Sequence, residues 1–533
     1  MSRASDIARI SAKGSFHFFW GLVVSTLILA IGTIFIARLL GSNLYGLYGV
    51  IFTAPTLISL FRDWGVNSAV TQFTAQYKSE GRVDEIRSVL ASGLIFEIMV
   101  GFALSIVSFG LSGFIASSIF HRPGIVSLVR IASFSILGGG IANAATGTFT
   151  GIEKMEPNSV MLILQSIVKT VAVVVLVILG LSVSGATIGY TVSFIAGAIV
   201  GSIFVWNIYR KLPETPNGKL QIRAYMTAMF SYGMPLSLAG NLSGLLSQFY
   251  VVLLPIYYVT NNSPIGNYSI AQTFAVLITF VATPINTMLF PAFSKINPQK
   301  EGELLQNVFQ YSVKYSSLLV VPTAALVMCL SQPGVSLLFG STYSSAPLFL
   351  ALLSINYLFT AFGNLSIGAF LSGQGKNTYK LKLAALTGAL GFPLGYVMIM
   401  HFGVLGLIVA GLISGVPSLV LSLRWIKKHY DLSVDWFSSA RILLCAGVAG
   451  VPAYFLVSSL PIEKLADLVI GLVFFLGVFV TAAVVTRAIN RPDIAYLRSM
   501  SSGLGIISVI SAFFLGLVER VDSHLTNSDS VSN

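Results

Sequence analysis

Apolar residues gather in long runs along nearly the whole chain, and short polar stretches separate these runs. A helix needs about 20 apolar residues to cross the ~30 Å hydrocarbon core of a bilayer. The pattern therefore predicts an all-α polytopic membrane protein with about 14 transmembrane helices. The expected spans are residues 15–40, 44–61, 88–113, 127–150, 158–180, 184–207, 228–254, 265–291, 314–339, 345–371, 379–401, 404–426, 441–460 and 466–486.

The composition agrees with this class. Of the 533 residues, 55% are hydrophobic and only 9% are charged, whereas about 25% are charged in a soluble domain. The two cysteines, Cys329 and Cys445, lie in apolar runs, and the five histidines are scattered. This pattern excludes a disulfide framework and offers no metal-ligand spacing. We therefore expect no metal and no cofactor.

The net charge of +12 would also suit a nucleic-acid-binding protein, but the basic residues are spread over short loops. Cytoplasmic loops of membrane proteins are enriched in Lys and Arg. With the N-terminus inside, the inner loops and helix ends hold 25 of the 31 Lys and Arg residues. The outer side holds Arg38, Arg122, Arg130 and Lys464. We expect a multi-pass plasma-membrane protein with a cytoplasmic N-terminus and no nucleic-acid partner.

Short segments repeat at a nearly constant spacing of about 220 residues. The matching pairs are 46–48 with 266–268, 149–154 with 371–376, and 183–185 with 404–406. Six expected spans separate the copies, so both copies insert in the same orientation. The repeat predicts two six-helix lobes related by pseudo-two-fold symmetry, with two extra helices and the substrate site between the lobes.

The expected divisions follow from this repeat. We expect an N-terminal lobe, a C-terminal lobe, two additional transmembrane helices, and a short apolar helix followed by a polar tail. These cover residues 1–210, 211–430, 431–500 and 501–533. The apolar stretch 502–518 is either an interfacial helix, which we favour, or a short further span.

Lys169 is the most informative single residue. It lies about 18 Å into the run 158–180, near the middle of the hydrocarbon layer. A cation at this depth costs several kcal/mol unless it faces water or a partner. Asn158 and Gln165 share its helix face, at spacings of i, i+7 and i+11. We interpret Lys169 as a site for an anionic group, and the alternative is a structural ion pair with Glu97.

Other polar positions are weaker candidates. Glu97 continues along its helix as a stripe of small residues that either lines a cavity or packs closely against another helix. The stripe is Gly101, Ser105, Ser108 and Ser112. Arg38 and Arg130 lie near the outer ends of their spans, where they either snorkel to the interface or form the outer end of a cationic path.

The expected second lobe contains amides but no mid-span charge, so we expect charge recognition in the first lobe. Such amides either bond neighbouring helices or contact sugars. They are Asn241, Gln248, Asn286 and Asn364.

The chain resembles a known family in several places. Ala37-Arg38-Leu39-Leu40-Gly41, then Gly46-x-Tyr48 and Asp63-Trp64-Gly65, are similar to the start of Wzx-type polysaccharide and oligosaccharide flippases. These belong to the multidrug/oligosaccharidyl-lipid/polysaccharide exporter superfamily. The turns 373–376 and 403–406 also fit, and the likeness covers nearly the whole chain. The resemblance implies movement of a lipid-linked oligosaccharide from the inner to the outer leaflet, without catalytic residues.

The leading hypothesis is therefore not an enzyme but a flippase that works by alternating access. Its partners would be a lipid-linked oligosaccharide and membrane lipids, with a proton or sodium ion as candidate coupling ion, and we expect a monomer. A drug or metabolite antiporter of the same superfamily is the alternative, although acidic cavity residues would suit its cations better. A membrane glycosyltransferase or polymerase is disfavoured because the longest loops have only about 25 residues.

Overall fold

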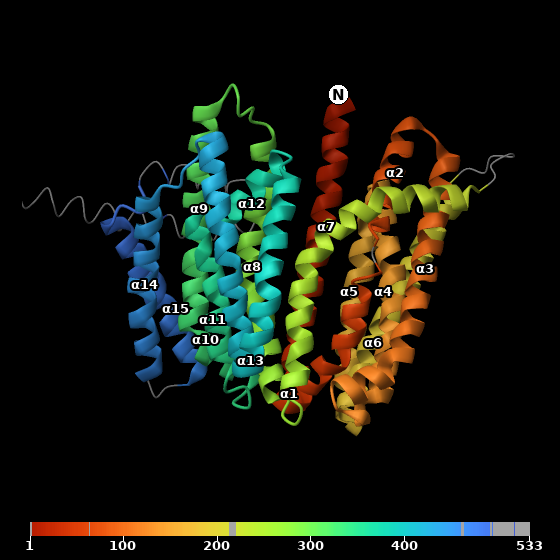
Figure 1. Cartoon of the computed structure of the whole chain (residues 1–533), viewed down its shortest axis with the longest axis horizontal. Helices are drawn as coiled ribbons and strands as arrows, with labels where there is room; N and C mark the ends of the chain where they lie inside the picture. The colour runs from red at the N-terminus through yellow and green to blue at the C-terminus, as the bar shows by residue number, and fades with distance from the viewer. Residues whose placement is uncertain are drawn as a thin grey trace, which may run out of the picture. The chain divides into compact units, whose positions relative to one another are not determined.

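The computed structural model describes residues 3–62, 64–212, 220–459 and 463–490, together with residues 493 and 516. Side chains of residues 3–17, 79, 235, 236 and 238–243 lie outside this description, as does the apolar stretch 502–518 apart from residue 516. Within the described ranges every regular element is helical (Figure 1). The expected all-α class is confirmed.

The first half of the chain forms six α-helices. They are α1 (Arg3–Ser59), α2 (Val66–Glu80), α3 (Val83–Phe114), α4 (Val126–Ile152), α5 (Glu156–Leu176) and α6 (Ser182–Lys211). Two π-helical turns and one 3₁₀ turn extend them. These are η1 (Ile115–Ile119), η3 (Val177–Leu181) and η2 (Pro123–Ile125).

The remaining described residues form nine α-helices and a 3₁₀ turn, η4 (Phe359–Phe362). The helices are α7 (Ile222–Tyr257), α8 (Ser263–Ser294), α9 (Gly302–Cys329), α10 (Ser331–Phe339), α11 (Ala346–Leu358), α12 (Asn364–Gly373), α13 (Asn377–Tyr430), α14 (Trp436–Ser459) and α15 (Lys464–Val485).

Three long helical stretches break at a glycine. Gly41 in α1, Gly180 between α5 and α6, and Gly403 in α13 have φ of 70°, 89° and 57°. Glycine enters this left-handed region without a Cβ clash. Each break falls between two spans that the apolar pattern separates, because the chain must turn there while remaining hydrogen-bonded.

Nine helices in the described part are long and apolar enough to cross a membrane, or ten if the bent pair Ala346–Phe362 and Asn364–Gly373 forms one span. Three of the nine contain one of the glycine breaks. The number of fourteen crossings stays a prediction, whereas the multi-pass helical architecture is confirmed.

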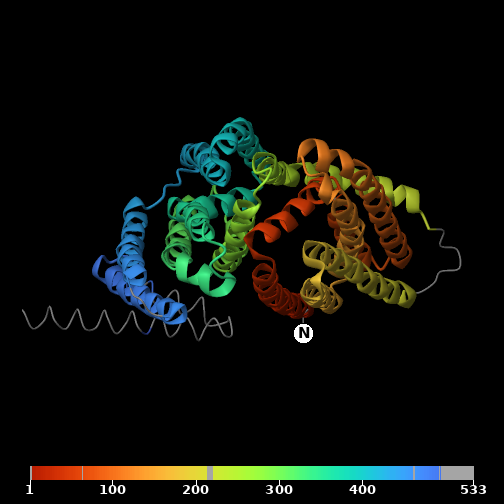
Figure 2. The same cartoon turned by 90° about the horizontal axis from the view of Figure 1, so that it is seen from below.

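The chain divides into two compact units. The first comprises Met1–Ser269 with Gly388–Leu407, and the second comprises Ile270–Thr387 with Ile408–Asn533. In the first unit α4 packs against α3 and α6, and α5 packs against α1 and α6 (Figure 2). The expected lobes, residues 1–210 and 211–430, remain a proposal.

One repeated segment forms the same turn twice. After α4, Glu153 has a φ of 62°, and the Lys154 N–H donates to the Phe149 carbonyl at 2.9 Å. After α12, Gly375 has a φ of 67°, and the Lys376 N–H donates to the Leu371 carbonyl at 2.8 Å. This is the hydrogen bond that closes a Schellman-type helix end. The shared geometry supports the internal repeat at the level of local structure.

A second repeated pair meets inside the first unit. A Cβ on Gly46 of α1 would collide with the Asn262 carbonyl oxygen, and a Cβ on Gly266 of α8 would collide with the Ser42 carbonyl oxygen. The Oγ atoms of Ser42 and Ser263 are 2.8 Å apart. Because the two collisions are reciprocal at a spacing of 220 residues, the contact has the form of a local two-fold.

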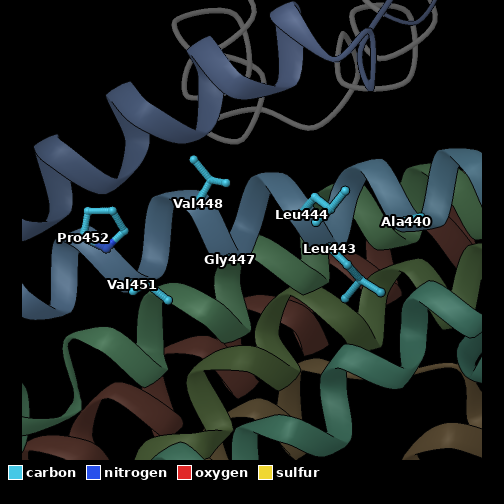
Figure 3. A pocket seen from close by; sticks show the side chains of 7 residues that line it. All are labelled: Ala440, Leu443, Leu444, Gly447, Val448, Val451 and Pro452. Carbon is cyan, nitrogen blue, oxygen red and sulfur yellow. The ribbon is translucent and has the colours of Figure 1, made fainter.

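The second unit has an apolar groove along α14 with a volume of about 770 Å³ (Figure 3). All of its lining residues are on α14: Ala440, Leu443, Leu444, Gly447, Val448, Val451 and Pro452. Leu444, Val448 and Val451 are exposed, which suits a surface that faces lipid. The groove therefore does not suit a polar headgroup.

Candidate functional site

Lys169 on α5 lies against an aromatic ring of the neighbouring helix. Its Nζ is 4.8 Å from the centroid of the Tyr190 ring on α6. The two residues lie eleven positions before and ten positions after Gly180, so the break there brings them to the same level. Among the described residues, Lys169 has this contact and no hydrogen bond or ion pair.

The pairing expected as the alternative role of Lys169 is not present. The carboxylate of Glu97 on α3 is fully buried, and its Oε2 lies 3.8 Å from Nε of Arg62, which follows α1. Its Oε1 accepts a long hydrogen bond from Asn143 Nδ2 of α4 at 3.4 Å. Glu97 is therefore paired with Arg62, and the Lys169 ammonium contacts the Tyr190 ring.

Two glycines make room for this ion pair. A Cβ on Gly139 would lie 2.6 Å from Arg62 Nη1, and a Cβ on Gly140 would lie 3.1 Å from Glu97 Oε2. The sequence analysis singled out neither Arg62 nor Asn143. The run of three glycines at 138–140, facing a span that carries a glutamate, was the available signal.

The polar network continues toward α2. Asn67 Nδ2 donates to Asn143 Oδ1 at 3.2 Å, and Thr71 Oγ1 donates to the Gly147 carbonyl at 3.2 Å. Arg62, Glu97, Asn143 and Asn67 thus join the end of α1 to α2, α3 and α4. The exposed edge of α2 carries a further ion pair, Lys78 to Glu153 at 2.8 Å.

The small-residue stripe beyond Glu97 packs against α4. Ser105 Oγ donates to the Ser133 carbonyl at 3.0 Å, and the Oγ atoms of Ser108 and Ser133 are 2.7 Å apart. Gly101 approaches the Leu137 backbone, where an added Cβ would lie 3.3 Å from Cα. Of the two interpretations, close helix packing is the one that these contacts support.

The aromatic ring under Lys169 belongs to a cluster from α1 and α6. The Tyr190 centroid lies 4.1 Å from Phe52, 5.0 Å from Phe194 and 6.2 Å from Tyr48. Tyr45, Tyr48 and Phe52 follow one face of α1 at i, i+3 and i+7. The sequence analysis used Tyr48 in the repeat and in the family resemblance, and did not predict this cluster.

The polar face of α5 divides between different neighbours. Asn158 is 1% exposed, and its Oδ1 accepts from Thr146 Oγ1 of α4 at 3.2 Å. Gln165 lies against α6, where a Cβ on Gly197 would be 3.2 Å from its Oε1. Asn158 thus contacts α4, whereas Gln165 and Lys169 both contact residues of α6.

The two outer arginines of the prediction are exposed. Arg130 Nε donates to Ser112 Oγ at 3.2 Å, and its guanidinium lies 5.2 Å from the Phe109 ring. Contact with α3 at an exposed position agrees with an interfacial role. The cationic path remains a hypothesis for Arg38 and Arg130.

Arg122, which the sequence placed in an outer loop, has a structural role. It is 9% exposed, donates from Nη2 to the Tyr258 carbonyl and donates from Nε to the Val259 carbonyl at 3.2 Å. Arg122 therefore satisfies carbonyls at the C-terminal end of α7. Burial lowers the pKa of its guanidinium from the usual range.

The amides predicted for the second lobe are Asn241, Gln248, Asn286 and Asn364. The Asn241 side chain lies outside the described residues. Gln248 is half-buried, and Asn286 and Asn364 are exposed. Within the described part of the chain none of these three makes a hydrogen bond between helices, so a role in sugar contact remains a hypothesis.

Known proteins resemble the chain over most of its length. The lipid II flippase MurJ of Bacillus subtilis (strain 168) is 20% identical over 494 residues, which is 82% of this chain and 87% of that protein. The structure matches that of a lipid II flippase MurJ in an inward closed conformation with a TM-score of 0.69 at 14% identity, over 88% of this chain and 98% of that chain.

An inward-facing multidrug resistance MATE family transporter of the MOP superfamily has a TM-score of 0.61 at 16% identity, over 76% of this chain and 94% of that chain. At these identities the structural matches establish the fold, which is the all-helical one described above. Residues 11–297, more than half of the chain, match the family described as polysaccharide biosynthesis protein. The match includes Lys169 and Glu97, and because it covers more than half of the chain, the chain belongs to the polysaccharide biosynthesis protein family.

Proposed function

We propose that this protein is a flippase that moves a lipid-linked oligosaccharide from the inner to the outer leaflet of the cell membrane. Family membership supports the proposal, together with similarity to a protein named as a lipid II flippase. The observation that carries it is Lys169, a cation in the middle of an apolar span with no ion pair among the described residues. Such a charge usually marks a substrate or ion pathway.

The physical need for a transporter comes from the headgroup. Each polar group that enters hydrocarbon without a hydrogen-bond partner costs several kcal/mol. An oligosaccharide carries many hydroxyls, so its unaided crossing is extremely slow. A polar path in the protein replaces water for the headgroup while the lipid tail stays in the bilayer. Alternate exposure of that path to the two sides would then move the headgroup across.

Lys169 would receive the charged part of this headgroup. A phosphate that links sugar to lipid is anionic, and an ammonium that makes no hydrogen bond among the described residues is a suitable partner. Gln165, which faces the same neighbouring helix, would contact polar groups nearby. Glu97 stays engaged with Arg62 and would act on the site through the packing of α3 and α4.

A drug or metabolite antiporter is the second candidate, because a multidrug transporter shares the fold. Cationic drugs would require an acidic site. In the first unit the buried carboxylate of Glu97 is paired with Arg62, whereas Lys169 offers a positive charge. This charge arrangement favours an anionic, lipid-linked substrate over a cationic drug.

The finer features remain part of the proposal. We expect a monomer with a cytoplasmic N-terminus, because this orientation places most Lys and Arg residues inside. A proton or sodium ion is the candidate coupling ion. The two-lobe arrangement, with residues 1–210 and 211–430 as the lobes, is supported by the repeated turns at Glu153 and Gly375.

The test is flipping by the purified protein. The full chain is reconstituted in vesicles that contain a phosphate-linked lipid oligosaccharide, and the sugar exposed on each side is measured with a membrane-impermeant glycosidase. The proposal predicts that sugar becomes accessible from both leaflets within the assay only when the protein is present. Transport of a cationic dye with no movement of the oligosaccharide would establish the antiporter instead.

A further inference from the structure

The ring of Tyr190 contacts two residues that carry hydrogen-bond donors, Lys169 and Tyr48. Lys169 Nζ lies 4.8 Å from its centroid, and no N–H of this ammonium is used in a hydrogen bond among the described residues. Tyr48 of α1 packs edge-on to the same ring at 6.2 Å between centroids. The Tyr48 hydroxyl is buried and has no hydrogen-bond partner among the described residues.

Such a pair of groups is unusual in a folded protein. Buried polar atoms nearly always have a partner, and each exception requires an explanation. Here the recorded neighbours of Tyr48 are the rings of Tyr45, Phe52 and Tyr190. Glu97, a buried carboxylate of the same unit, forms its ion pair with Arg62.

We propose that Tyr48 and Lys169 together form a subsite for the phosphate of the lipid-linked headgroup, with Tyr190 as the residue that positions the ammonium. This inference rests on the proposed function and adds two residues to it. A phosphate oxygen only accepts hydrogen bonds, so it suits an ammonium and a phenol that both have donors to spare. A neutral lipid alcohol would use the same donors far less well.

Tyr190 acts on the ligand through Lys169. An ammonium over the face of a tyrosine is attracted by the negative ring face. The contact holds the flexible lysine against α6 before the anion arrives, so fewer rotamers are lost on binding. This role needs the aromatic ring of Tyr190 but not its hydroxyl.

The subsite makes different predictions for binding and for stability. Loss of a hydrogen bond to a charged group costs about 1.5 kcal/mol or more, which is about ten-fold in affinity. Tyr48→Phe should therefore weaken binding of an anion about ten-fold. It should not lower the melting temperature of the ligand-free protein, because the lost hydroxyl has no hydrogen-bond partner among the described residues.

The experiment compares farnesyl diphosphate with the neutral alcohol farnesol as probes, by native mass spectrometry of the detergent-purified full chain. The wild type should bind the diphosphate more tightly. Tyr48→Phe and Lys169→Met should each reduce this preference about ten-fold. Tyr45→Phe, which removes a hydroxyl one turn away on the same helix, is the matched control and should keep the wild-type preference.

Tyr190 is tested by a double-mutant cycle. Tyr190→Phe should keep the preference, and Tyr190→Leu should reduce it. Tyr190→Leu should have no further effect on the preference when Lys169 is already Met, because the ring acts through the ammonium. An equal effect of Tyr190→Leu in both backgrounds would show a merely structural ring and would overturn the positioning role.

The outcomes separate the subsite from the proposed function. If the wild type prefers the diphosphate and both Tyr48→Phe and Lys169→Met keep that preference, the subsite is refuted and the flippase is not. Equal wild-type binding of the two probes also refutes the subsite. A protein that moves no lipid-linked oligosaccharide in vesicles refutes the proposed function, whatever the binding ratio.

Discussion

Replacement of Lys169 by alanine should strongly reduce transport while the protein still folds. The change removes a cation–π contact worth about 2 kcal/mol when desolvated. It also removes the cost of a mid-membrane lysine, which insertion experiments place at about 2.5–3.5 kcal/mol. These terms are opposite in sign and similar in size, so the stability of Lys169→Ala should stay close to that of the wild type.

The effect on transport should be much larger. A phosphate charge about 4 Å from the ammonium gains about 4 kcal/mol at an effective dielectric constant of about 20. Each ~1.4 kcal/mol is a factor of ten in rate. If the interaction acts during crossing, Lys169→Ala should reduce the flipping rate between about 100-fold and 1,000-fold by this estimate.

The assay is the glycosidase measurement in vesicles, with protein amount matched by quantitative blotting. Lys154→Ala is the control, because Lys154 is a lysine in the short turn before α5. Normal export by well-folded Lys169→Ala would refute the substrate role of Lys169. If Lys169→Ala misfolds and Glu97→Gln restores folding, the two residues form a structural pair. The structure predicts no such rescue, because Glu97 forms an ion pair with Arg62.

Further predictions test the packing, the repeat contact and the topology. Gly140→Ala should destabilise the protein by about 1–3 kcal/mol in thermal unfolding, because the new Cβ would lie 3.1 Å from Glu97 Oε2. Gly113→Ala is the control and should not destabilise the protein, because no atom lies within 4 Å of its Cβ. In a background without Cys329 and Cys445, Ser42→Cys with Ser263→Cys should form a disulfide, because the Oγ atoms are 2.8 Å apart. On the alternating-access proposal the cross-link stops flipping until a reductant is added, and full flipping by the cross-linked protein would contradict it. Reporter fusions should be cytoplasmic at Gly218, Gly302, Asn377 and Asp431 and external at Asn262 and Ser341. One fusion on the opposite side would contradict the expected topology.

Much of the fold follows from local features of the sequence. The apolar runs predict the helices, and the turns at Gly41, Gly180 and Gly403 fall where one expected span ends and the next begins. The repeat at residues 149–154 and 371–376 predicts a shared turn, which the structure shows. These features depend on a few neighbouring residues, so one sequence contains enough information to find them.

The site was only partly predictable because its contacts join distant helices. Depth alone identified Lys169 as unusual, but its nearest aromatic ring depends on how α5 and α6 pack. The sequence offered Glu97 as the obvious partner of Lys169, since both lie within spans. The structure pairs Glu97 with Arg62, which lies beyond the end of an expected span, and Gly139 and Gly140 provide the space.

The most direct test of the central claim is the distribution of an anionic lipid-linked oligosaccharide in vesicles with a controlled membrane potential. Potassium and valinomycin set the potential under symmetric pH and sodium. Outward movement of one negative charge gains about 2.3 kcal/mol per 100 mV, inside negative. We predict that vesicles with the protein move the headgroup to the outer leaflet, faster and further as the interior becomes more negative. Vesicles with the protein that keep the same leaflet distribution as protein-free vesicles, at every potential, would contradict the account.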